Sequence, residues 1–210
     1  MKHFVFDLDG TLIDSHSPYH ETMHLVFGRY KDEAKPIDYS LIRKVFAHKF
    51  MSLHIPEERM EEAYAYYMKL SMDQVDQIKP FDGIMDVLRY LTKKNVPIAI
   101  WTGREKKTAV EVLQKTGLDR FARQLVTGEC VDNNKPSPDG LLKILNDNQW
   151  SARDAVMIGD SDFDVLGARG AQVKAVSVGW GANPDSAALA KISDHHFDAV
   201  SDFHRWVEAI

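Results

Sequence analysis

The stretch Phe4-Val5-Phe6-Asp7-Leu8-Asp9-Gly10-Thr11 places a short apolar run directly before two carboxylates and a glycine. An apolar run of this length, ended by a turn signal, predicts a buried strand. Asp and Gly are also common in turns for purely local reasons, so this motif alone does not establish a site. It does indicate that two acidic side chains leave a buried strand together, where a cation is needed to balance them.

Four further apolar runs repeat the strand pattern, at residues 96–100, 124–126, 155–158 and 173–178. Between most of them lie segments whose apolar residues have helical spacing. This alternation predicts a parallel sheet with helices on both faces, a three-layer α/β fold. Right-handed crossovers would bring the loops that follow the strands to one edge of the sheet, where ligands bind in such folds.

The interval between the first and second strands is too long for a simple crossover, which needs about a dozen residues. Residues 15–79 contain no convincing strand pattern, and their apolar residues follow helical spacing. We therefore predict two domains. Residues 1–14 and 80–210 would form an α/β core, and residues 15–79 an inserted helical domain.

The composition is that of an ordinary globular protein, with 44% apolar residues, 27% charged residues and a net charge of −5. A net negative charge, without clusters of Lys and Arg along the sequence, argues against binding to nucleic acid. No apolar run approaches the roughly 20 residues that span a bilayer, and the first residues lead into a strand and not into a signal peptide. We expect a cytoplasmic monomer or homodimer that acts on a small solute.

A second acidic loop, Gly159-Asp160-Ser161-Asp162-Phe163-Asp164, follows the fourth apolar run. If the first and fourth strands are neighbours, about 4.8 Å apart, Asp7 and Asp160 can share one hard cation. Mg²⁺ is the natural choice for carboxylate oxygens and water. We expect Asp162 to be the N-cap of the next helix, and Asp164 to orient its neighbours without binding the ion itself.

Two more loops offer groups that suit a phosphoryl anion. Thr102-Gly103 follows the second strand and supplies a hydroxyl group and an unobstructed backbone N–H. Lys135, in Asn134-Lys135-Pro136, follows the third strand and can neutralise both a phosphoryl group and the carboxylates around it. Each signal is common by itself, but all four in this order, each after an apolar run, indicate phosphoryl transfer.

In these motifs the sequence resembles the haloacid dehalogenase superfamily. The match consists of residues 7–12 for the first motif, Thr102 for the second, Lys135 for the third and residues 159–164 for the fourth. The resemblance implies a Rossmannoid core with strand order 5-4-1-2-3. It also implies that the insertion between the first two motifs is a helical cap that closes over the active site.

The same resemblance implies roles for the acidic residues. Asp7 would be the nucleophile that forms an aspartyl phosphate, and Asp9 the general acid and base. Mg²⁺ would be held by Asp7, Asp160 and the backbone carbonyl of Asp9. Thr102, Gly103 and Lys135 would bind the phosphoryl oxygens, with Asp164 in a supporting role.

The predicted function is therefore a Mg²⁺-dependent phosphatase for a small phosphate monoester, similar to phosphoglycolate phosphatases in cap position and in residues 7–15. A phosphosugar mutase of the same superfamily would use the same core residues, with Arg43, Lys44 and Lys49 as candidates to hold a second phosphate. A phospho-accepting signalling module is a non-enzyme alternative, although such modules have no acid at the position of Asp9 and no large insertion.

Substrate selectivity has four candidates, His16, His20, Arg43 and Arg104. Many phosphoglycolate phosphatases have Asn-Lys after the residue of the second motif, where this chain has Gly103-Arg104. Arg104 either contacts an anionic tail of the substrate or begins the following helix. The sequence leaves both interpretations open.

Overall fold

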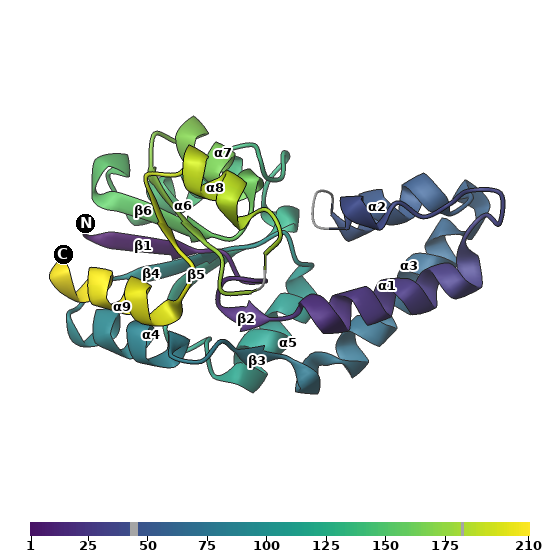
Figure 1. The fold of residues 1–210 in the computed structure, drawn as a ribbon, viewed down its shortest axis with the longest axis horizontal. Coiled ribbons are helices and arrows are strands. Elements are labelled where there is room, and N and C mark those ends of the chain that lie inside the picture. The colour runs from purple at the N-terminus through teal and green to yellow at the C-terminus, as the bar shows by residue number, and fades with distance from the viewer. Residues whose placement is uncertain (43–45, 182) are drawn as a thin grey trace. The chain divides into compact units, whose positions relative to one another are not determined.

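The computed structural model describes residues 1–42, 46–181 and 183–210, which form two compact units (Figure 1). Unit 1 consists of Met1–Asp14 and Lys79–Ile210, and unit 2 of Ser15–Ile78. Each unit has a hydrophobic core of its own residues. The assignment of the two units as a catalytic core domain and a cap domain stays a prediction.

Unit 1 contains a six-stranded parallel sheet in the order β5-β4-β1-β6-β7-β8. Its strands are β1 (His3–Phe6), β4 (Ile98–Trp101), β5 (Ala122–Val126), β6 (Ala155–Gly159), β7 (Lys174–Val178) and β8 (His195–Phe197). Counted along the chain, the first five strands of this sheet are β1, β4, β5, β6 and β7. In that count they lie in the expected order 5-4-1-2-3, which in the labels used here is β7-β6-β1-β4-β5. The sixth, β8, pairs with β7 and was not predicted, because its His-His-Phe sequence lacks an apolar strand pattern.

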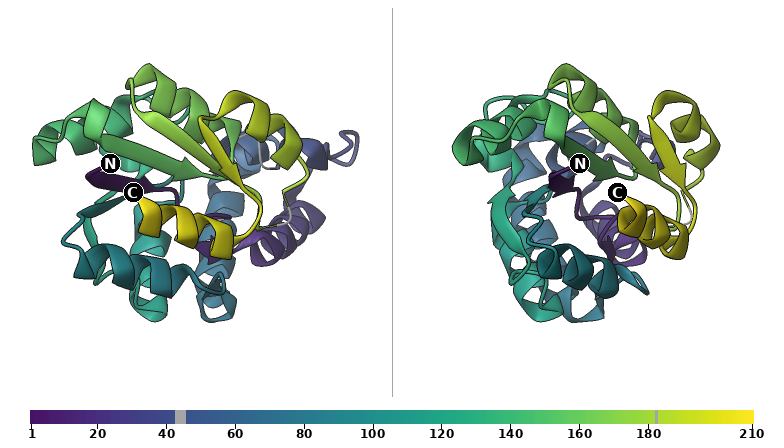
Figure 2. Two further views of the ribbon diagram at one scale, coloured as in Figure 1. Left: turned by 60° about the vertical axis from the view of Figure 1, so that its left-hand side comes forward. Right: turned by 90° about the vertical axis from the view of Figure 1, so that its left-hand side faces the viewer.

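Helices cover both faces of this sheet (Figure 2). On one face lie α6 (Asp139–Asn148), α7 (Asp162–Gly170) and α8 (Ser186–Ile192), whose apolar residues share a core cluster with Val5, Ala99 and Met157 of the strands. On the other face lie α4 (Ile84–Lys93), α5 (Lys106–Thr116) and α9 (Val200–Ala209). There the rings of Phe6 and Phe203 meet edge to face, with centroids 6.2 Å apart. The predicted three-layer α/β class is confirmed.

Smaller elements complete unit 1. β2 (Ile13–Asp14) and β3 (Lys79–Pro80) form a two-stranded antiparallel sheet where the chain leaves unit 1 and returns to it. The 3₁₀ helix η4 (Gly128–Cys130) precedes the loop that carries Lys135. A second 3₁₀ helix, η5 (Ala152–Asp154), directly precedes β6. Strands of two residues carry no periodic signal, so the sequence did not predict this second sheet.

The described part of unit 2 contains helices and no strand. Its elements are α1 (His16–Tyr30), η1 (Tyr39–Leu41), α2 (Ala47–His54), η2 (Glu57–Arg59), α3 (Met60–Asp73) and η3 (Val75–Gln77). Phe27 lies in its core and contacts the rings of Phe50 and His54 edge to face, at centroid distances of 5.1 and 5.5 Å. Across the described ranges of both units, no helix is long and apolar enough to cross a membrane.

Candidate active site

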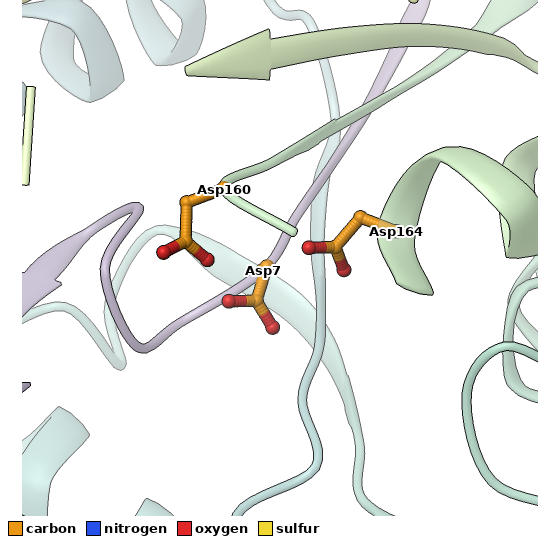
Figure 3. A group of neighbouring side chains, drawn as sticks. All are labelled: Asp7, Asp160 and Asp164. Carbon is orange, nitrogen blue, oxygen red and sulfur yellow. The ribbon is translucent and has the colours of Figure 1, made fainter. Parts of the chain in front are cut away.

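Three buried carboxylates, those of Asp7, Asp160 and Asp164, converge at one edge of the main sheet (Figure 3). Asp7 directly follows β1 and Asp160 directly follows β6, while Asp164 lies in the first turn of α7. The parallel pairing of Phe6 with Ile158 brings the two strand ends side by side. One oxygen of each carboxylate lies within 4.8 Å of the other two, so these three groups can share one cation.

Gly10 shapes the turn that follows the first acidic motif. Its φ of 77° lies in the left-handed region, which glycine adopts without the strain that a side chain would introduce. The amide of Leu12 then donates to the carbonyl of Leu8 over 2.9 Å and closes the turn. The local sequence thus turns the chain back at the strand end and keeps both aspartates of the motif at the sheet edge.

Lys135 lies among the carboxylates. Its Nζ donates to Oδ1 of Asp7 at 2.7 Å, to Oδ1 of Asp164 at 2.6 Å and to the carbonyl of Trp101 at 2.7 Å. Burial lowers the pKa of Lys135, but the two carboxylates outweigh this effect and raise the pKa above its ordinary value. The side chain is therefore a cation at neutral pH. Because these three acceptors use all its N–H groups, a direct bond to a phosphoryl oxygen requires the exchange of one of them.

One lysine does not fully compensate the buried acids. Burial raises the pKa of Asp7 well above its ordinary value, Lys135 lowers it, and the neighbouring Asp164, Asp160 and Asp9 raise it further. With all three carboxylates ionised, the three acids and the single ammonium group would carry a net charge of −2. A divalent cation would remove this excess, and carboxylate oxygens are ligands that suit Mg²⁺. The residues present therefore fit a magnesium ion.

Both oxygens of Asp164 are used within the protein. One accepts from Lys135, and the other accepts from the backbone N–H and the hydroxyl group of Ser161, at 3.1 and 2.5 Å. Ser161 is the N-cap of α7, so the expectation that Asp162 caps this helix is wrong. Ser161 has the extended backbone of a cap and its Oγ accepts from the amide of Asp164, whereas Asp162 already belongs to the first helical turn.

Thr102 and Gly103 follow β4, the strand beside β1. Thr102 is buried, its amide donates to the carbonyl of Val126 at 3.0 Å, and its Oγ1 accepts from the amide of Arg104 at 3.1 Å. These bonds hold the threonine hydroxyl at the end of its strand. The phosphate-binding role of Thr102 and Gly103 stays a prediction.

Arg104 is paired with Asp9. Its Nε donates to both carboxylate oxygens of Asp9 at 3.1 Å, and its Nη2 lies 2.5 Å from Oδ1. The two side chains are 12% and 30% exposed, so the pair is largely shielded from water. α5 begins at Lys106 with Glu105 as its N-cap, so Arg104 does not begin that helix. The pairing with Asp9 was not anticipated from the sequence.

Two residues in the loop after β7 hold the backbone of the site, and the sequence analysis missed both. Nδ2 of the buried Asn183 donates to the carbonyl of Asp160, and Nε1 of Trp180 donates to the carbonyl of Thr11 at 3.0 Å. Neither residue belongs to a motif. Their only signal is position, because the loop after the fifth predicted strand reaches the same edge as the other site loops.

We expect Asn183→Ala to weaken Mg²⁺ binding about tenfold, because loss of a group that orients a metal ligand commonly costs 10- to 100-fold in affinity. The measurement is the Mg²⁺ concentration that gives half-maximal activity. Asn146→Ala, at an exposed position of α6, is a control that should leave this concentration unchanged. An unaltered Mg²⁺ requirement in Asn183→Ala would show that its hydrogen bond does not position Asp160.

The remaining selectivity candidates lie elsewhere. His16 and His20 belong to α1 of unit 2. Arg43 lies outside the described residues, as does Lys44, and Lys49 is an exposed residue of α2. A role of these residues in substrate selection, or in a mutase reaction, stays a prediction.

The parallel sheet, with acidic and basic side chains gathered at its strand ends, is the arrangement that the sequence motifs predicted. Residues 4–178 match the family model described as haloacid dehalogenase-like hydrolase. The chain therefore belongs to the haloacid dehalogenase-like hydrolases, as its motifs indicated.

Relatives within this family carry phosphatase names. A pyrophosphatase, PpaX of Halalkalibacterium halodurans, is 32% identical over 184 residues, which cover 84% of this chain and 82% of the relative. Phosphoglycolate phosphatase 1 of Pseudomonas aeruginosa is 29% identical over 189 residues, 85% of this chain and 70% of the relative. The crystal structure of a hydrolase from Pseudomonas syringae has the same fold, with a TM-score of 0.84, 24% identity and coverage of 100% and 99%. The chain is an enzyme of the phosphatase class.

Proposed function

We propose that this enzyme is a Mg²⁺-dependent phosphatase that hydrolyses a small phosphate monoester through an aspartyl phosphate on Asp7. The observation that carries the proposal is the convergence of Asp7 and Asp160 in a buried cluster with excess negative charge. Mg²⁺ bound by Asp7, Asp160 and the carbonyl of Asp9 would offset the repulsion between the nucleophile and an anionic substrate. Unit 2 would then be the cap domain of the enzyme.

In the first half-reaction, a carboxylate oxygen of Asp7 attacks phosphorus. The bond between phosphorus and the leaving-group oxygen breaks as the bond to Asp7 forms, and Asp9 donates a proton to the departing oxygen. For this step one oxygen of Asp9 is protonated and exchanges its bond from Arg104 for one to the leaving group. Lys135 contributes positive charge next to the attacking oxygen, since its Nζ lies 2.7 Å from Oδ1 of Asp7. Thr102 and Gly103 bind phosphoryl oxygens from the neighbouring strand end.

In the second half-reaction, Asp9 takes a proton from water. The water oxygen attacks phosphorus of the aspartyl phosphate, the bond to Asp7 breaks, and inorganic phosphate leaves with the Asp7 carboxylate restored. Asp164 keeps Lys135 in place during both steps, because Lys135 is bound to Asp164 as well as to the nucleophile. Each residue thus returns to its starting state after one turnover.

The names of the relatives suggest two kinds of substrate, pyrophosphate and phosphoglycolate. Both are small phosphates that carry further negative charge beyond the scissile bond. The test is to measure kcat/KM for a panel of small phosphate esters and pyrophosphate, with Mg²⁺ and with a chelator. Mg²⁺-dependent release of inorganic phosphate supports the proposal, whereas a stable phosphoprotein without phosphate release would favour a signalling module and sugar-phosphate isomerisation would favour a mutase.

We expect Asp9→Asn to slow both half-reactions, by roughly 10²- to 10⁴-fold, because an amide can neither donate nor accept the required proton. Rapid-quench measurements of leaving-group release and of phosphate release would follow the two steps separately. Asp86→Asn, at an exposed position on α4, is the control for loss of a carboxylate. If only one step slowed in Asp9→Asn, a single residue would not serve as both acid and base.

A further inference from the structure

We propose that Arg104 binds an anionic group on the leaving-group side of the substrate, so that the enzyme selects phosphates with a second negative charge next to the scissile oxygen. This inference rests on the proposed function and deepens it by defining the substrate class. It draws only on Asp9, Arg104 and their neighbours in unit 1.

The geometry places Arg104 close to the leaving group. A general acid must lie about 2.6–3.2 Å from the oxygen that it protonates, so Asp9 marks the position of the scissile oxygen. Nη2 of Arg104 lies 2.5 Å from Oδ1 of Asp9. The guanidinium group is therefore within two hydrogen-bond lengths of the scissile oxygen. A carboxylate or phosphate attached next to that oxygen comes within its reach.

Lys135 and Arg104 contact different acidic residues of the first motif. Lys135 is bound to the nucleophile Asp7, whereas Arg104 is bound to the residue that serves the leaving group. The next cations along the chain, Lys106 and Lys107, are exposed at the start of α5. Within this loop of unit 1, Arg104 is therefore the partly buried cation beside Asp9, on the side where the substrates of different phosphatases differ.

Hydrogen bonds within the protein hold Arg104 in position before a substrate binds. Its amide donates to Oγ1 of Thr102, and its side chain approaches both oxygens of Asp9 through Nε. A guanidinium group that binds one carboxylate in this way has the shape to bind a second carboxylate or a phosphate with paired bonds. Glycolate and phosphate are leaving groups of this kind, and a neutral alcohol is not.

The test uses two substrates that differ in one group. In 2-phosphoglycolate a carboxylate follows the carbon next to the scissile oxygen, and in 2-hydroxyethyl phosphate a hydroxymethyl group takes its place. We expect the ratio of kcat/KM for phosphoglycolate to kcat/KM for hydroxyethyl phosphate to fall roughly 10- to 100-fold in Arg104→Gln, because a hydrogen bond to a charged group is lost. Both substrates need Asp9 in the same way, so the ratio separates recognition by Arg104 from any change at Asp9.

Matched variants sharpen the comparison. Arg104→Lys keeps the charge without the paired donors, and it should restore the ratio in part. Lys107→Gln removes an exposed positive charge three residues away and should leave the ratio as in the unmodified enzyme. Pyrophosphate, measured in parallel, shows whether the recognised anion is a phosphate. A selective loss in Arg104→Gln on phosphoglycolate, on pyrophosphate or on both supports the inference.

An equal loss on phosphoglycolate and hydroxyethyl phosphate in Arg104→Gln, with no greater loss on pyrophosphate, would overturn the inference, because Arg104 would then act only through Asp9. An unmodified enzyme that prefers hydroxyethyl phosphate would overturn it as well. These results differ from a failure of the proposed function, in which the unmodified enzyme would release no phosphate from any of the three substrates with Mg²⁺ present.

Discussion

Asp7→Asn should abolish turnover and at the same time raise the melting temperature of the metal-free protein. The loss of activity follows from the proposed role of Asp7 as nucleophile, since removal of a nucleophile can cost roughly 10⁶-fold in kcat. The gain in stability follows from burial, which raises the pKa of Asp7 well above its ordinary value. An amide at this position has no charge to bury.

The stability gain should depend on pH. The raised pKa means that native Asp7 binds a proton more readily than unfolded Asp7, whose pKa is about 3.9. Its contribution to the free energy of unfolding is therefore unfavourable above that pH, and it grows as pH rises toward the native pKa. We expect the stabilisation by Asp7→Asn to be clear at pH 8 and to shrink as pH falls toward 4.

Thermal unfolding with a chelator and with Mg²⁺, alongside an assay of phosphate release, measures both effects. Mg²⁺ should raise the melting temperature of the unmodified protein and raise it less in Asp7→Asn. Asp162→Asn changes an exposed acid beside the same site and should alter neither stability nor turnover markedly. Full Mg²⁺-dependent activity in purified Asp7→Asn would show that the nucleophile lies elsewhere.

Lys135→Met should be strongly destabilising, by about 3–5 kcal/mol in the free energy of unfolding at neutral pH without metal. Removal of one partner from a buried ion pair leaves its opposite charge uncompensated, which is the reason for this magnitude. Here the ammonium group serves both Asp7 and Asp164, at 2.7 and 2.6 Å, and all three side chains are buried. Turnover should fall as well, because Asp7, the proposed nucleophile, loses the cation beside it.

The pH dependence again has a definite sign. Lys135 lowers the pKa of Asp7, so its removal raises that native pKa further. The variant should therefore lose most stability above neutral pH and regain part of it as pH falls toward about 4, where the buried carboxyl groups bind protons. Mg²⁺ should also restore part of the lost stability.

Urea unfolding at several pH values measures these changes. Lys143→Met is the matched control, since Lys143 pairs with Asp147 on the surface of α6 at 41% side-chain exposure and such pairs contribute about 1 kcal/mol or less. Equal stability of Lys135→Met and Lys143→Met at pH 8 would contradict a buried cluster held together by Lys135.

Much of the core could be predicted from the sequence because each strand carries its own local pattern. Apolar runs before Asp7 and Asp160 predicted two strands, and the resemblance placed them side by side, as the pairing of β1 with β6 shows. The strand β8 was not predicted, because its His-His-Phe sequence has no apolar strand pattern. Its strand conformation depends on backbone pairing with β7. The helix cap at Ser161 was assigned one residue too late, because Ser and Asp are both favoured caps.

The sequence by itself determined the class of fold, the family and the identity of the acidic and basic residues that follow the strands. It could do so because strand patterns and motif order are local properties that survive without coordinates. Only the tertiary structure decided that Arg104 pairs with Asp9, that Lys135 bridges Asp7 and Asp164, and that Asn183 binds the backbone of Asp160. These contacts join residues far apart in the chain, so they depend on strand register and side-chain conformation, which no local pattern encodes.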